Sequence, residues 1–240
     1  MAVALTAKLF IERLQAMQDD EELRKIQRYF KLDAGEYGAG DRFIGVRMGH
    51  VFALAKEFVA MPPEEIERLL ESDIHEARAG ALRLMADQYR LKTTTPERRR
   101  ELYELYLRRH DRINNWDLVD LAAWWVVGSY LVDKPRDVLH ALAQSETMWE
   151  RRTAILATFP FIRRGQFDDT FAIAETLMAD PEDLIHKACG TMLRAVSEED
   201  GVAFRAFIDR HAAQMPRTML RYAIEKLPPD ERKRILAMGK

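Results

Sequence analysis

The segment Glu150-Arg-Arg-Thr-Ala-Ile-Leu156 decides the fold, because related segments occur before and after it in the chain. Glu76-Ala-Arg-Ala-Gly-Ala-Leu82 and His186-Lys-Ala-Cys-Gly-Thr-Met192 each place a cation just before small residues, after a shorter predicted helix and a polar turn. Arg152 and Lys187 are 35 residues apart, and Arg78 and Arg152 are 74 apart, about two steps of 37. Such a period predicts stacked helical hairpins of the HEAT type.

The small residues and the cations of these segments have separate consequences. Small side chains let neighbouring helices approach closely, while a cation at the matching place in each repeat would form a basic stripe along one face. The alternative is that each cation is an ordinary solvated charge. The segment Tyr89–Arg112 is also rich in cations, and it is either an exposed helix with internal ion pairs, such as Glu104 with Arg108, or part of a positive groove.

Composition supports an all-α protein of substantial size. The 240 residues are 48% hydrophobic and 32% charged, with only 9 Pro and 11 Gly, so neither a disordered chain nor a disulfide miniprotein fits. The single cysteine, Cys189, predicts a reducing compartment. No apolar stretch reaches the roughly 18 residues that cross a bilayer, so we expect no membrane partner. The net charge of −2 does not exclude a nucleic-acid partner, because binding depends on the charge of the surface that contacts the nucleic acid.

The order of patterns along the chain predicts one repeat domain over residues 1–240. Residues 1–32 read as two amphipathic helices, residues 33–42 as a Gly-rich loop, and residues 43–240 as stacked helical repeats interrupted at prolines. Thr95 and Asp180, each before a proline, are candidate N-caps. Glycines 35, 38 and 40 forbid a stable helix, and the loop serves either as a connection or as a functional segment.

A polar turn followed by a helix carries the candidate chemistry. In Asn114-Asn-Trp-Asp-Leu-Val-Asp120, the asparagines suit a turn and Asp117 is placed to accept backbone N–H groups of the next helix. Trp116 then lies near a helix N-terminus with Asp120 one turn further on the same side. Either an aromatic face and a carboxylate point together into a site, or Trp116 is a core aromatic and Asp120 an acid that favours the helix dipole.

Several segments resemble the AlkD family of DNA alkylation repair glycosylases in order and approximate spacing. The resemblance covers the chain from about Tyr29 to its end, and it is carried by Phe43-Ile-Gly-Val46, Asn115-Trp-Asp-Leu-Val-Asp120, Trp149-Glu-Arg-Arg-Thr-Ala-Ile-Leu156 and His186-Lys-Ala-Cys-Gly-Thr-Met-Leu-Arg194.

The resemblance implies a right-handed α-solenoid of HEAT-like hairpins with a concave DNA-binding groove. It implies a hydrolase of N-glycosyl bonds that excises N3- or N7-alkylated purines from duplex DNA, without extruding the base. Trp116 and Asp120 match the catalytic positions and Arg152 the contact to the DNA backbone beside the lesion. Lys187 and Arg194 match positions that face the duplex, and Arg47 is a further candidate for a phosphate contact.

The sequence predicts no cofactor and no metal site. The histidines are scattered without the paired spacing of a metal centre, and no phosphate-binding glycine loop occurs. We expect a monomer in the cytoplasm of a bacterial-type cell, associated with the nucleoid while it acts on alkylated double-stranded DNA.

One position departs from the pattern that the resemblance implies. The family has a second catalytic tryptophan on the helix that carries Lys187, and here the ungapped comparison places Thr191 there. A catalytically weak or inactive DNA-binding HEAT protein is therefore an alternative. A protein-binding α-solenoid scaffold is a second alternative, because helical repeat arrays often hold other proteins.

Overall fold

The computed structural model describes residues 4–32 and 36–238, and these residues fold as α-helices joined by short turns. No strand occurs in these two ranges; one isolated parallel bridge joins Arg42 and Ile74. The predicted all-α fold of helical repeats is confirmed. The helices group in two compact units, Met1–Val126 and Val127–Lys240. The single repeat domain over residues 1–240 stays a prediction.

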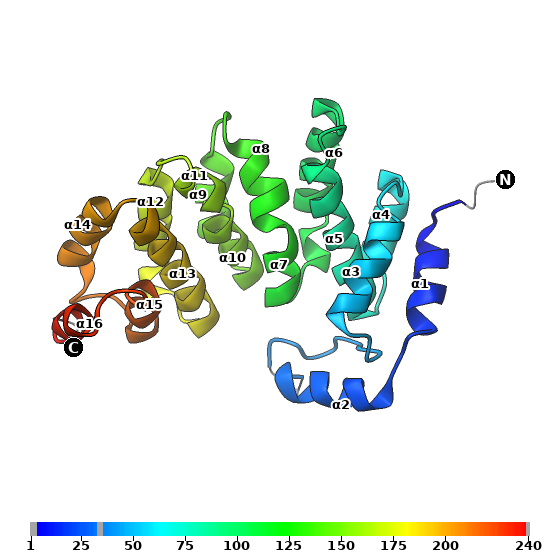
Figure 1. Cartoon of the computed structure of the whole chain (residues 1–240), viewed down its shortest axis with the longest axis horizontal. Helices are drawn as coiled ribbons and strands as arrows, with labels where there is room; N and C mark the ends of the chain where they lie inside the picture. Colours follow the sequence, from blue (N-terminus) through cyan, green and yellow to red (C-terminus); the bar gives the residue numbers. More distant parts are fainter. Residues whose placement is uncertain (1–3, 33–35, 239–240) are drawn as a thin grey trace. The chain divides into compact units, whose positions relative to one another are not determined.

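The N-terminal unit consists of helices of one to four turns, with α2 lying crosswise to the others (Figure 1). Its helices are α1 (Ala7–Gln15), α2 (Asp20–Tyr29), α3 (Met48–Glu57), α4 (Pro63–Leu70), α5 (His75–Arg90), α6 (Pro96–Arg108), the 3-10 turn η1 (His110–Arg112) and α7 (Trp116–Ala122).

A π-helical stretch, η2 (Ala123–Gly128), continues directly from α7. The helices that follow are α8 (Ser129–Leu131), α9 (Asp137–Ala143), α10 (Met148–Leu156), α11 (Phe159–Ile162), α12 (Asp168–Thr176), the 3-10 turn η3 (Leu177–Ala179), α13 (Asp183–Glu199), α14 (Gly201–His211), α15 (Arg217–Ala223) and α16 (Pro229–Leu236).

Helix starts follow the polar residues and prolines of the sequence. The carboxylate of Asp19 accepts the backbone N–H groups of Glu21 and Glu22 at 2.8 and 2.9 Å, which starts α2, the second of the two helices predicted in residues 1–32. Thr95 caps α6 as predicted, accepting from the backbone of Arg98 at 3.2 Å. The prediction for Asp180 is wrong in detail, because its carboxylate closes the turn before α13 rather than capping the helix.

Helix α5 is the centre of the N-terminal core. Residues from all of its faces are buried, including the apolar Leu82, Leu84 and Met85. A Cβ on Gly80 would lie 2.5 Å from the ring of Phe10 on α1, so the absent side chain is what lets α1 pack closely. The predicted close approach of helices at small residues is confirmed here.

Helix α13 has the same central place in the C-terminal unit, where it packs against α10, α14 and α15. A Cβ on Gly190 would lie 2.6 Å from the carbonyl oxygen of Met219 on α15. This glycine therefore sets the distance between the two helices.

Helices α5 and α10 begin with matching hydrogen bonds. The hydroxyls of Ser72 and Ser145 each accept the backbone N–H two residues later, at 3.1 and 3.0 Å. Arg78 and Arg151 each donate from Nη1 to the carbonyls five and six residues earlier, at 2.9–3.2 Å. The two helix starts are thus equivalent, which supports the repeat inferred from the sequence.

These hydrogen bonds show that the predicted alignment of Arg78 with Arg152 and Lys187 is wrong. Arg78 stands four positions after the N-cap of its helix, as Arg151 does, whereas Arg152 and Lys187 stand five positions after theirs. One residue on a helix is a rotation of about 100°. Arg78 therefore does not share the face of Arg152 and Lys187.

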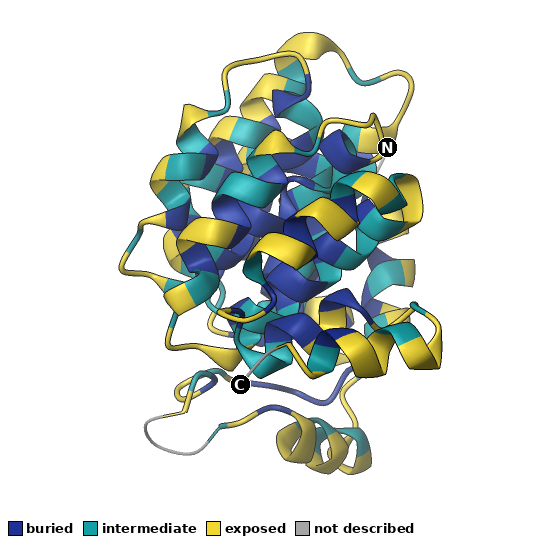
Figure 2. Cartoon of the chain, turned by 90° about the vertical axis from the view of Figure 1, so that its left-hand side faces the viewer, coloured by how far each residue is buried: buried dark blue, intermediate teal, exposed yellow. Residues whose placement is uncertain are grey.

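The segment after the Gly-rich loop holds α2 to the rest of its unit. Helix α2 has no buried residue, and in Figure 2 the helix beside the grey segment at the bottom shows only exposed and intermediate colours. Gly45 has φ +80°, and a Cβ there would lie 2.2 Å from the carbonyl oxygen of Asp19 and 2.8 Å from the backbone nitrogen of Leu23. Backbone thus packs directly on backbone. Of the predicted loop glycines, Gly35 lies outside the described residues.

No helix in the described ranges has the length and apolar character needed to cross a bilayer.

The close approach at Gly45 predicts that Gly45→Ala destabilises the protein by about 2–5 kcal/mol, from left-handed strain plus the steric clash with α2. Gly40→Ala is the matched control. Gly40 also has positive φ, +87°, but open space surrounds its would-be Cβ, so the loss should be about 1 kcal/mol. Urea unfolding measures both, and equal losses would show that the contact with α2 contributes no free energy.

Candidate functional site

Trp116 and Asp120 lie one turn apart at the start of α7, as the sequence predicts. Trp116 is the first residue of the helix, and the side chain of Asn115 caps it by accepting the Trp116 backbone N–H at 2.8 Å. Residues four apart on a helix share one face. Both side chains are partly exposed, so Trp116 is not a core aromatic.

Two rings from the end of α2 flank Trp116. Phe30 stacks on it with 5.5 Å between ring centroids and 17° between planes, and Tyr29 meets it edge-on at 5.8 Å. Phe30 is buried, whereas Tyr29 is 69% exposed. Neither residue could be predicted from the sequence as a neighbour of Trp116, because both lie far from it in the chain. The one sequence feature that could have indicated them is their position as an aromatic pair at the end of a strongly charged predicted helix.

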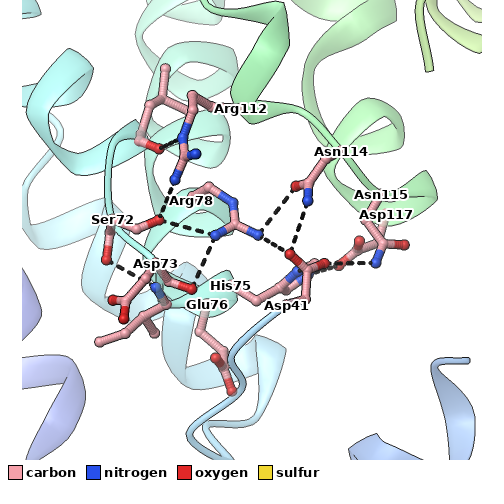
Figure 3. A network of polar contacts seen from close by, with 12 residues as sticks. Asp41, Ser72, Asp73, His75, Glu76, Arg78, Arg112, Asn114, Asn115 and Asp117 are labelled. Carbon is pink, nitrogen blue, oxygen red and sulfur yellow. Dashed lines mark hydrogen bonds and ion pairs between the residues drawn. The ribbon is translucent and has the colours of Figure 1, made fainter. Parts of the chain in front are cut away.

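A buried network joins the Gly-rich loop, α5 and α7 beside these rings (Figure 3). The ring of His75 is fully buried and lies between two carboxylates: Nε2 is 2.8 Å from Oδ2 of Asp117, and Nδ1 is 3.2 Å from Oδ2 of Asp41. The prediction that Asp117 caps α7 is wrong. Asn115 is the cap, and the carboxylate of Asp117 binds His75 instead.

The carboxylate of Asp41 accepts hydrogen bonds from three further residues. Arg78 donates from Nη2 to Oδ1 of Asp41, and Asn114 and Asn115 donate to its two oxygens at 3.0 and 3.1 Å. Figure 3 shows the guanidinium of Arg78 between Asp41 and the backbone carbonyls of the turn before α5. Arg78 is 3% exposed, so the prediction of a surface stripe that includes it is wrong. This arginine ties the loop to α5.

Opposite charges keep the buried groups ionised. Burial alone would lower the pKa of His75, but hydrogen bonds and charge from Asp117 and Asp41 outweigh it and raise the pKa from 6.5 to about 9. Burial alone would raise the pKa of Asp41, yet the hydrogen bond from His75 and the charge of Arg78 hold it well below its ordinary value. Two carboxylates and two cations therefore balance near neutral pH.

Glu76 fixes the segment that follows the loop. Its buried carboxylate accepts the backbone N–H groups of Ile44, Gly45 and Val46 at 2.9–3.2 Å. Three converging amides suit a carboxylate well. Phe43, just before them, stacks on His75 with 4.2 Å between centroids. This loop segment is thus held at both ends by α5.

The cations predicted to hold phosphates in the C-terminal unit have defined partners. Arg152 is 7% exposed and donates from Nη1 to the carbonyl of Leu184 at 2.9 Å. Lys187 pairs with Asp183 at 2.8 Å, and Arg194 pairs with Glu225.

Thr191 and Arg47 complete the predicted set. The hydroxyl of Thr191 donates a hydrogen bond to the carbonyl of Lys187 at 2.8 Å, one turn earlier in the same helix. In the N-terminal unit, the exposed Arg47 pairs with Glu22 at 2.6 Å.

Helix α6, which carries much of the cation-rich run, has ion pairs within the helix, as the first of the two alternatives predicts. On α6, Arg100 pairs with Glu104 at 3.5 Å and Arg98 with Glu101 at 3.3 Å. The specific pair of Glu104 with Arg108 was wrong, because Arg108 reaches Glu67 on α4 at 2.8 Å. Within the described residues, no group of three or more potential metal ligands comes together.

Comparisons with known proteins point to one family. Residues 10–227 match the family model for a DNA alkylation repair enzyme. A solved structure of a predicted DNA alkylation repair enzyme from Enterococcus faecalis has the same fold, with a TM-score of 0.67 and 18% identity over 89% of this chain and 98% of that chain. Among curated proteins, no match was found.

The raised pKa of His75 predicts that stability falls at alkaline pH. The imidazolium contributes fully below pH 6.5, and its contribution is lost as the pH rises through about 9, an effect on the order of 3 kcal/mol. Urea unfolding at pH 6 and pH 10 should show this fall in the native protein and not in His75→Gln. As control, His140→Gln removes a half-exposed histidine paired with Asp169 and should keep the native fall. An unchanged pH dependence in His75→Gln would contradict the assignment.

Proposed function

The chain belongs to the family of DNA alkylation repair enzymes and has a role in DNA repair, and from this premise we propose that it is a glycosylase that removes N3- or N7-alkylated purines from duplex DNA. The observation that carries the proposal is the pairing of Trp116 and Asp120 on one face at the start of α7, partly exposed, with Trp116 braced by Phe30 and Tyr29.

The proposed chemistry needs little more than charge stabilisation. Alkylation at N3 or N7 makes the purine cationic, so the base leaves as a neutral molecule and needs no protonation. The bond between C1′ and the base nitrogen breaks with its electron pair going to the base, and water then adds to C1′ and loses a proton. The face of Trp116 and the carboxylate of Asp120 both stabilise the positive charge that grows on the sugar. Asp120 also orients the water.

Tyr29 offers a second aromatic surface in the N-terminal unit. The family pattern has a second tryptophan where this chain has Thr191, whose hydroxyl is bonded to its own helix. Tyr29 contacts Trp116 and exposes most of its ring, so we include it in the proposed substrate contacts.

The proposed phosphate contacts are Arg47, Arg152, Lys187 and Arg194. Arg47, Lys187 and Arg194 are each paired with a carboxylate, so a DNA phosphate would replace an existing partner rather than neutralise an unpaired charge. Arg152 would act from a buried position, held by the carbonyl of Leu184. Such contacts position the duplex without reading its bases. We further propose that the protein is a monomer and that it acts at the nucleoid in the cytoplasm.

A DNA-binding member with weak or no catalysis is the second candidate. Thr191 in place of an aromatic residue favours it. Binding of alkylated duplex without release of base by the native protein would decide for this candidate.

Asp120→Asn should reduce the release of 7-methylguanine or 3-methyladenine from methylated DNA by about 10²–10³-fold, because it removes the charge that stabilises the sugar cation. Affinity for the duplex should stay within about twofold. Trp116→Ala should lose activity, while Trp116→Phe, which keeps a ring, should retain part of it. Chromatography of the released base measures each rate.

The control is Asp209→Asn, an exposed carboxylate on α14, which should release base at the native rate. Native release by Asp120→Asn would remove Asp120 from the mechanism.

Replacing Arg47, Lys187 and Arg194 together with Gln should reduce the slope of log affinity against log salt by about 3, because each phosphate contact contributes about 0.9. Fluorescence anisotropy of a labelled duplex at several salt concentrations measures this slope.

The matched control replaces three other ion-paired arginines with Gln: Arg13, Arg163 and Arg205. We expect it to keep the native slope, and equal slopes for the two triple variants would refute the proposed contacts.

A further inference from the structure

A buried ionic cluster lies directly behind the proposed site. It consists of Asp41 from the loop, His75 and Arg78 from α5, and Asp117 from α7. The first three side chains are at most 3% exposed, and that of Asp117 is 13% exposed. Burying four charged groups is costly, and apolar residues of similar size commonly hold a fold at least as well. A cluster of this kind suggests a role in placing something accurately, beyond holding the unit together.

The cluster reaches α7 at two points: Asn115, the N-cap, donates to Asp41, and Asp117 binds His75. Asp117 follows Trp116 and precedes Asp120 by three residues, so it belongs to the same first turn. Asp41 has four donors, from His75, Arg78, Asn114 and Asn115. Among the described residues, Asp117 receives a hydrogen bond from His75 alone, at 2.8 Å, and its Oδ1 is buried without a hydrogen-bond partner. The Asn115 cap holds the start of the helix, and the contact of Asp117 with His75 holds the rotation of its first turn.

His75 also touches the rings that support Trp116. Its own ring lies 5.4 Å from Phe30 and 4.2 Å from Phe43, and Phe30 is the ring on which Trp116 stacks. One buried side chain thus contacts α7 by a hydrogen bond and the partner of Trp116 by packing. A shift of His75 would move both.

We propose that His75 is a positioning residue for base excision, which fixes the first turn of α7 through Asp117 and so places Trp116 and Asp120 against the sugar of the damaged nucleotide. This inference rests on the proposed glycosylase function. It assigns no proton transfer to His75, whose two ring nitrogens are both bound to carboxylates within the unit.

If the contact acts by placing α7, the length of residue 117 matters more than its charge. Asp117→Asn keeps the side-chain length and an acceptor for Nε2 of His75. Asp117→Glu keeps the charge and the acceptor but adds one methylene, which pushes the turn away from His75. An error of about 1 Å in the position of a reacting group can reduce a rate by about 100-fold.

The test measures single-turnover base release by these variants on methylated duplex DNA, together with duplex affinity. We expect Asp117→Asn to react within about threefold of the native rate, and Asp117→Glu to react about 10- to 100-fold more slowly, with unchanged duplex affinity in both. Asp137→Glu, which lengthens an exposed first-turn acid on α9, is the control and should keep the native rate. A slow Asp117→Asn beside a native-like Asp117→Glu would overturn the proposal in favour of a role for the charge.

A second measurement separates this inference from the function on which it rests. With 5-fluorotryptophan incorporated, the ¹⁹F resonance of Trp116, assigned by its loss in Trp116→Phe, should move in Asp117→Glu and keep its native position in Asp117→Asn. If the native protein releases no base, the proposed function fails and the resonance alone decides the placement. A resonance that stays at its native position in Asp117→Glu would overturn the inference.

Discussion

The contact of one buried imidazolium with two carboxylates links the loop, α5 and α7 of the N-terminal unit. His75 can be charged in a dry environment because Asp41 and Asp117 lie on either side of its ring, and Asp41 can be charged because Arg78 and two asparagines also reach it. Each ion is tolerated only while the others stay in place. The loop, α5 and α7 are therefore fixed to one another in one arrangement.

This constraint explains how a helix with no buried residue can contribute to a site. Helix α2 is held by the backbone contact at Gly45 and by the ring of Phe30, both of which depend on the segment that Glu76 and His75 fix from α5. Tyr29 is thereby kept beside Trp116 while most of its surface stays exposed. Rigid parts of the unit support an aromatic surface that remains open to solvent.

The C-terminal unit shows how similar residues take different roles in neighbouring positions. Arg151 and Arg152 are adjacent, yet Arg151 binds the carbonyls of the preceding turn and Asp180, whereas Arg152 reaches the carbonyl of Leu184. The equivalence of Arg151 with Arg78 marks a structural position of the repeat. The face that holds Arg152 and Lys187 is a different one, and the proposed phosphate contacts belong to it.

The sequence by itself determined the helical class and the placement of Trp116 and Asp120 one turn apart, because both follow from local patterns of helix-forming and capping residues. The resemblance of a few segments indicated the family. It could not determine that Asp117 turns away from its own helix to His75, that Arg78 is buried, or that Tyr29 and Phe30 flank Trp116. Those outcomes depend on which residues, distant in the sequence, lie beside a charged or aromatic group once the helices have packed. Only the tertiary structure decided them, since a buried charge is stable only where folding brings an opposite charge to it.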